Sequence, residues 1–99
     1  MRTISIFDRA GAFAENKDTA KDIRVNGIFP ALNAGEDIVL DFEKVDAATQ
    51  SFIHALISDV IRKLGSDALD RISFRSCSPT VKKIIGIVVD YMQEGLGPE

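Results

Sequence analysis

The sequence has few of the residue types on which disulfides, zinc sites and most catalytic centres depend. Its 99 residues include one cysteine, one histidine and no tryptophan. A lone cysteine excludes an internal disulfide, and one cysteine with one histidine cannot supply a structural zinc site. We therefore expect neither a metal nor another cofactor.

Long apolar runs and a basic charge excess are also missing. The longest apolar run, residues 84–89, is too short to span a bilayer, and Asp8 with Arg9 interrupts the N-terminal stretch before it could form a signal peptide. The net charge of −3 gives no basic field that would attract nucleic acid or anionic lipid. We expect a cytoplasmic protein that binds neither nucleic acid nor a membrane.

The remaining composition is typical of one small globular domain. Hydrophobic residues make up 45% of the chain and charged residues 27%, which argues against disorder. Ninety-nine residues leave no room for a second core, so residues 1–99 are expected to form a single domain. We expect residues 1–2 and 95–99 to fray.

The apolar pattern predicts strands and helices in alternation. Strand patterns fall at residues 3–7, 37–42 and 70–76, and helix patterns at 19–34, 49–64 and from 79 onward. Residues 38–40 (Ile-Val-Leu) do not alternate with polar residues, which is typical of a strand covered on both faces. Residues 8–17 and 43–48 are expected to be loops. Pro30 lies inside the first helix pattern, where we expect a kink or a break.

Capping residues indicate where these helices begin and end. Thr19 with Asp22 forms a capping-box pattern at the start of the first helix, and residues 33–35 (Asn-Ala-Gly) form a plausible stop. Ser78 is a favourable N-cap for the last helix, with Pro79 at its first position.

The predicted order β-α-β-α-β-α defines the fold class. Helical crossovers make neighbouring strands parallel, and their right-handedness limits the topology. We expect an α/β fold with a small single-layer sheet of three to four strands, with strand 37–42 inside it. The outer strands, 3–7 and 70–76, could be open for pairing, so both a monomer and a weak homodimer are compatible with the sequence.

Two side chains could carry chemistry. His54 follows Ser51 by three residues on one helix and could approach it, but no acidic residue is placed to hold the histidine. Because the neighbouring apolar residues take the buried face, we expect His54 at the boundary of that face or in solvent. Cys77 precedes a helix N-terminus, where the helix dipole lowers the pKa of a thiol. We expect no enzyme and no catalytic residue. The alternative is a small thiol-dependent enzyme or redox protein that uses Cys77.

The start of helix 49–64 is the most informative stretch of the chain. A helix N-terminus offers free backbone amides and a partial positive charge. A phosphorylated serine or threonine there would carry a charge of about −1.5 to −2, which such amides can hold. Thr49 and Ser51 are therefore either plain helix caps or part of a switch.

The stretch DIVLDFEKVDAATQSFIHAL, which begins at Asp37, resembles the central unit of STAS domains, the anti-sigma-factor antagonist fold. In that unit a strand with an acidic end leads through a loop to an Asp-Ser-Ser/Thr-Gly motif that opens a helix. The chain is also similar to the STAS-like family of unknown function, in which Pro-Ala-Leu, Asp-Phe and Ser-Phe recur in this order. Here these are residues 30–32, 41–42 and 51–52, and the likeness runs from about residue 22 to residue 64.

The resemblance implies a STAS-like fold and a regulatory, protein-binding role. Ser51 corresponds to the residue that a partner kinase phosphorylates in anti-sigma-factor antagonists, whereas Thr49, Gln50 and Phe52 replace the Asp, Ser and Gly of the motif. The implied partner is another protein, of which a GHKL-type ATPase or kinase is the family example. We predict that the loop and first helical turn bind this partner. The candidate contact residues are Asp46, Thr49, Gln50, Ser51 and His54.

Overall fold

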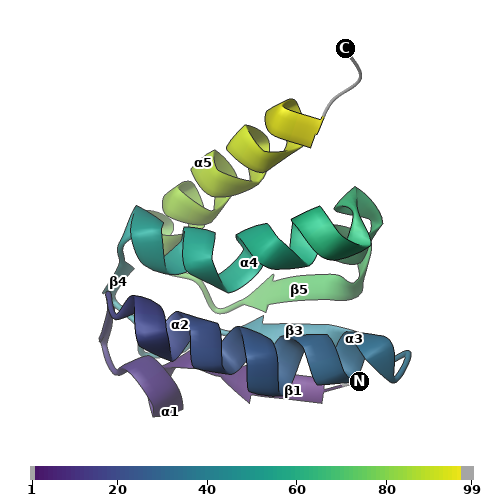
Figure 1. The fold of residues 1–99 in the computed structure, drawn as a ribbon. Helices are drawn as coiled ribbons and strands as arrows, with labels where there is room; N and C mark the ends of the chain where they lie inside the picture. The colour runs from purple at the N-terminus through teal and green to yellow at the C-terminus, as the bar shows by residue number, and fades with distance from the viewer. Residues whose placement is uncertain (1, 97–99) are drawn as a thin grey trace.

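The computed structural model describes residues 2–96 and is built on a three-stranded parallel sheet (Figure 1). Its strands are β1 (Arg2–Ser5), β3 (Ile38–Asp41) and β5 (Ile72–Arg75). Their spatial order is β1-β3-β5, with Ile4, Leu40 and Phe74 in register. The structure therefore confirms the α/β class, the parallel sheet and the central position of the strand predicted at 37–42.

The helices on the crossovers lie together on one face of the sheet (Figure 1). They are α2 (Lys17–Ile23), the π-helical turn η1 (Arg24–Ile28), α3 (Phe29–Asn33) and α4 (Gln50–Leu64). Two right-handed crossovers in the same direction place their helices on the same side. On the other face Val39 is only 7% exposed, although Thr3 and Ser73, its register partners, are exposed. β3 is thus buried as predicted, but helices cover it on one face rather than on both.

The predictions for the first residues are wrong in detail. The strand predicted at 3–7 ends at Ser5, whose hydroxyl oxygen accepts a hydrogen bond from the Asp8 N–H at 3.3 Å and caps helix α1 (Ile6–Ala10). The predicted loop 8–17 contains most of α1, the short strand β2 (Phe13–Ala14) and the first residue of α2. β2 pairs in parallel with β4 (Ala47–Ala48), which lies inside the second predicted loop.

The helix predicted at 19–34 is longer and less regular than expected. Its N-cap is Asn16 rather than Thr19, because the Asn16 side chain accepts hydrogen bonds from the N–H groups of Asp18 and Thr19. The π-helical turn η1 ends two residues before Pro30, so that the missing N–H of the proline falls in the first turn of α3. The chain stays helical through Pro30, so the break expected there is absent, and the irregularity of this helix is the π-helical turn before the proline.

The C-terminal half follows the predictions closely. α4 starts within one residue of the predicted position, and Gly35, at φ +83°, lies in the stop predicted at 33–35. The 3-10 helix η2 (Ser66–Arg71) takes the first part of the strand predicted at 70–76. Helix α5 (Pro79–Leu96) begins at the predicted residue. We expected residues 1–2 and 95–99 to fray. Arg2 lies in β1 and residues 95–96 continue α5, whereas residues 1 and 97–99 lie outside the described part.

The hydrophobic core lies between the sheet and the helical layer. α4 supplies its centre with side chains at helical spacing, which are Phe52, Ile53, Leu56, Ile57, Val60 and Ile61. Leu64, in the last turn of α4, is 41% exposed, because the helix leaves the core there. Within residues 2–96, no helix combines the length and the apolar character that crossing a membrane requires.

Candidate functional site

Helix α4 begins at a turn that Thr49 closes. The Thr49 hydroxyl oxygen accepts a hydrogen bond from the Phe52 N–H at 3.0 Å, and its carbonyl accepts one from the Ile53 N–H at 3.2 Å. The backbone of Thr49 is extended, as an N-cap residue requires. Of the two interpretations that the sequence left open, the structure therefore assigns Thr49 the role of a helix cap.

The loop before this turn is fixed by segments that are distant in sequence. The Asp46 N–H donates to the Ala12 carbonyl at 2.8 Å, and the Thr49 N–H donates to the Ala14 carbonyl at 2.9 Å. The Ser78 hydroxyl donates to the Asp46 carbonyl at 3.0 Å while it also caps α5. Asp46 itself is exposed. The start of α4 is thus a rigid feature of the surface.

Ser51 lies on this rigid turn with its side chain exposed. It is the second residue of α4, and the next two residues, Phe52 and Ile53, are fully buried. No hydrogen bond joins the Ser51 hydroxyl to another group among residues 2–96. The N–H groups of Gln50 and Ser51 precede any intrahelical acceptor, so the turn also presents a partial positive charge.

A shallow hollow of about 370 Å³ adjoins Ser51. Lys17, Gln50, His54 and Ala55 line it together with Ser51. Lys17 is the first residue of α2, which packs beside α4 in the helical layer (Figure 1). The structure thus brings together three of the predicted contact residues, Gln50, Ser51 and His54. It also adds Lys17, which sequence reasoning missed because it is distant along the chain.

His54 lies at the boundary of the core, as predicted. Its side chain is half-buried, and its ring centroid is 6.5 Å from that of Tyr91 on α5, with the planes tilted by 52°. Within the described residues no carboxylate forms an ion pair with His54. The side chain shown beside this imidazole is therefore the aromatic ring of Tyr91.

Cys77 is half-buried and lines a different hollow from His54. Burial raises the pKa of the Cys77 thiol, the ammonium of Lys82 lowers it to a smaller extent, and Asp41 adds a further small rise. The thiol is therefore mostly protonated at neutral pH, contrary to what its place before a helix suggests. Among the side chains that the structure describes, no group of three or more from His, Cys, Asp or Glu could hold a metal ion.

Asp41, at the end of β3, is held by two hydrogen bonds. Its carboxylate accepts from the Glu43 N–H at 3.0 Å and from the Arg75 guanidinium at 3.0 Å. These bonds, first that to Glu43 and then that to Arg75, lower the pKa of Asp41 below its ordinary value. The carboxylate therefore stays ionised and fixes the loop that leads toward α4.

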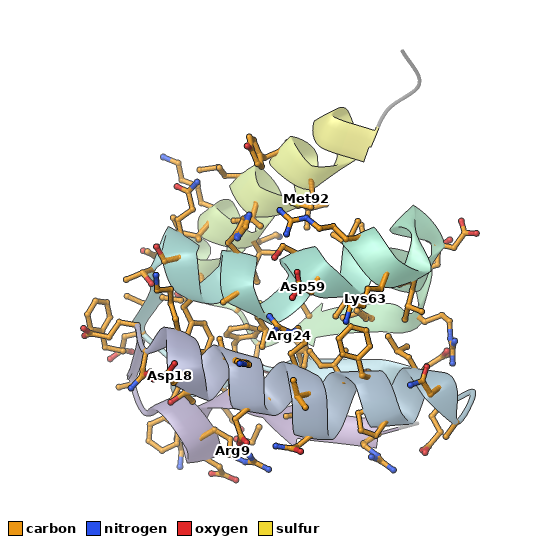
Figure 2. All side chains as sticks on the ribbon, in the orientation of Figure 1. Arg9, Asp18, Arg24, Asp59, Lys63 and Met92 are labelled. Carbon is orange, nitrogen blue, oxygen red and sulfur yellow. The ribbon has the colours of Figure 1, made fainter. Side chains whose placement is uncertain are left out.

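Arg24 makes a largely buried contact between helices that local sequence patterns could not identify. Its side chain is 12% exposed and extends from η1 to α4, where it binds the Asp59 carboxylate at 3.3 Å and the Ala55 carbonyl (Figure 2). Asp59 also binds Arg62 at 3.3 Å. Figure 2 shows Arg24 and Asp59 between the two helices. This contact holds α2 beside α4 and so helps to keep Lys17 near Ser51.

A comparison with known protein families matches residues 19–82 to the STAS-like domain of unknown function. No curated protein and no solved structure matches the chain. The matched segment includes β3, the α4 turn with Ser51, and β5, and it covers more than half of the sequence. The chain therefore belongs to the family of STAS-like domains of unknown function.

Proposed function

We propose that this domain is a non-enzymatic regulatory module, related in role to anti-sigma-factor antagonists. It binds another protein through the loop at Asp46 and the first turn of α4. The observation that carries the proposal is the exposed Ser51 hydroxyl on a turn that hydrogen bonds from Asp46 and Thr49 hold in place. A rigid, exposed turn suits recognition, because binding then loses little further conformational entropy of the chain.

The surroundings of Ser51 also suit control by phosphorylation. A phosphate on this hydroxyl would add about −1.5 to −2 charges next to the free amides of the α4 N-terminus. Lys17 and His54 line the same hollow, and the ammonium group of Lys17 would attract the phosphate. Because Ser51 is exposed, the modification would change the surface and leave the core intact.

The proposed partner is a cytoplasmic protein, and a GHKL-type ATPase or kinase fits the family resemblance. Such a partner would contact Asp46, Gln50, Ser51 and His54 and would sense the charge on Ser51. No cofactor enters this proposal, since the recognition uses only side chains and backbone groups of the turn.

The test compares Ser51→Asp with Thr80→Asp. Thr80 is an exposed second residue of α5, and its helix is capped by Ser78 as α4 is capped by Thr49. Both substitutions add one negative charge at the same helical position, so they have similar effects on helix stability. We expect Ser51→Asp to change the amount of partner that co-purifies from the host, and Thr80→Asp to leave it unchanged. The proposal would be rejected if the two variants co-purified equal amounts of the partner, or if no specific partner co-purified with the parent chain.

Phosphorylation of Ser51 is a separate prediction. After incubation with ATP and a GHKL-type kinase from the same host, the intact mass should increase by one phosphate. The Ser51→Ala variant should show no increase, whereas Thr80→Ala should be modified like the parent chain. A phosphate that still appears on Ser51→Ala, or a parent chain that stays unmodified, would reject phosphorylation at Ser51. The proposal that the α4 turn binds a partner would not be affected.

A further inference from the structure

Strand β5 ends the sheet with an open edge. The Arg75 carbonyl accepts a hydrogen bond from the Phe42 N–H at 2.8 Å, so the backbone of Arg75 faces β3. Successive residues of a strand direct their N–H and C=O groups to opposite sides, so those of Phe74 face away from β3. Within residues 2–96 no strand pairs with this side. The edge therefore offers unused backbone donors and acceptors.

A groove of about 620 Å³ lies between this edge and helix α5. Phe74 of β5 lines it from one side, and Ile85 and Val89 line it from α5. Cys77 closes it where the chain passes from strand to helix. Figure 1 shows α5 rising away from the sheet, with α4 between it and α2 in this view. Apolar side chains therefore line the place where a further strand would pack beneath the helix.

Gly86 keeps the α5 side of the groove open. A glycine inside a helix is unfavourable relative to alanine, so it usually has a packing or functional reason. A Cβ added to Gly86 would meet no atom within 4 Å, so the packing of this chain does not require a glycine there. The open space over Gly86 belongs to the groove and is available to a chain from outside.

The other open edge, at β1, lacks this space. There the helical layer packs directly on the strand, since a Cβ added to Gly27 would lie 2.9 Å from Cδ1 of Ile4. The hollow at that edge is about 340 Å³, and its lining includes Arg2, Asp8 and Arg9. The β1 edge thus offers a smaller hollow with a largely polar and charged lining, and β5 is the edge better suited to pairing.

The charge of the groove argues for an acidic partner rather than a second copy of the chain. Lys82 lines the groove, and none of the carboxylates whose side chains the structure describes forms an ion pair with it. A second copy paired through this surface would present the same groove residues, none of which is acidic. An extended segment with an acidic residue would instead complement it.

We propose that the β5–α5 groove binds an extended segment of another protein as an additional strand of the sheet. Backbone hydrogen bonds to Phe74 supply the pairing, and alternate apolar side chains of the segment enter the groove beneath α5. An acidic residue of the segment lies beside Lys82. This surface is separate from the Ser51 turn, so a partner held here could remain bound while the turn is modified.

The test is a titration of the ¹⁵N-labelled full chain with a blocked heptapeptide, Glu-Thr-Val-Thr-Val-Thr-Glu. Its acidic residues at both ends allow either strand direction, and its valines occupy alternate positions. We expect the amide signal of Phe74 to shift and its hydrogen exchange to slow, while the Ser51 amide stays unchanged. A peptide with two prolines at its centre should have no effect, because the prolines lack the N–H groups for pairing.

Matched variants separate groove binding from misfolding. Gly86→Leu fills the groove and should weaken peptide binding at least about tenfold, or about 1.4 kcal/mol. Gly86→Ala should bind like the parent chain and raise the Tm. Lys82→Glu should reverse the preference, so that the same peptide with lysine at both ends binds more tightly.

Three outcomes would overturn the proposal. The first is an unchanged Phe74 amide at millimolar peptide, and the second is a folded Gly86→Leu variant that binds as tightly as Gly86→Ala. The third is a dimer in sedimentation equilibrium whose Phe74 amide is protected without peptide. In that case a second copy of the chain occupies the groove.

Discussion

At the scale of single residues, Thr49 and Ser51 have different roles although they are two positions apart. The hydroxyl of Thr49 is bonded to the Phe52 N–H, whereas that of Ser51 is exposed. The sequence allows this distinction in part, because burial of Phe52 and Ile53 fixes which side of α4 faces the core. It could not indicate Lys17, whose position depends on the packing of α2 against α4.

The thiol of Cys77 provides a prediction at this scale. Burial raises the pKa of Cys77, so alkylation of the folded protein should increase with a midpoint above the ordinary value of about 8.5. Since the pKa in the folded chain exceeds that in the unfolded chain, stability should also fall as the pH rises through this range. The measurement is the alkylation rate against pH.

Two comparisons complete the Cys77 experiment. The chain unfolded in urea should titrate near the ordinary thiol value, and Lys82→Met should raise the folded midpoint further, because the Lys82 ammonium lowers it. A folded midpoint below that of the unfolded chain would instead support the alternative of a thiol-dependent enzyme or redox protein.

At the scale of elements, the apolar periodicity of the sequence correctly predicted the elements that are long or fully buried. α4 has enough turns for its apolar spacing to be evident, and β3 is a continuous apolar run. α1, β2 and β4 are too short for any period, and β2 pairs with β4 through a contact distant in sequence. The N-cap of α2 is Asn16 and not Thr19. Both residue types are favourable at an N-cap, so only the tertiary structure selects between them.

The α4 cap gives a prediction at the element scale. Thr49→Ala removes the acceptor of the Phe52 N–H and should lower the free energy of unfolding by about 1 kcal/mol. Thr49→Ser keeps the hydroxyl and should retain most of the stability. Thr80→Ala, an exposed change in α5, should stay within about 0.5 kcal/mol of the parent chain. Urea denaturation measures all three, and a loss in Thr80→Ala equal to that in Thr49→Ala would contradict the assignment of the cap.

At the scale of the whole molecule, the candidate surfaces follow from a small sheet with one helical layer. Parallel order and right-handed crossovers place α2 beside α4, which forms the hollow at Ser51. The sheet ends at β5, which leaves the groove under α5. The element order in the sequence predicts the first arrangement. The second depends on the angle at which α5 leaves the sheet, which local patterns do not determine.

The central claim is that the molecule is recognised at the α4 turn, and site-specific photocrosslinking in the host tests it most directly. A photoreactive residue at Gln50 lies on the exposed first turn of α4, whereas one at Asn33 is also exposed but lies at the opposite end of the helical layer (Figure 1). The account predicts a discrete protein adduct from position 50, absent from position 33 and reduced or abolished by Ser51→Asp. The same adduct from both positions, or an adduct from position 33 alone, would contradict it.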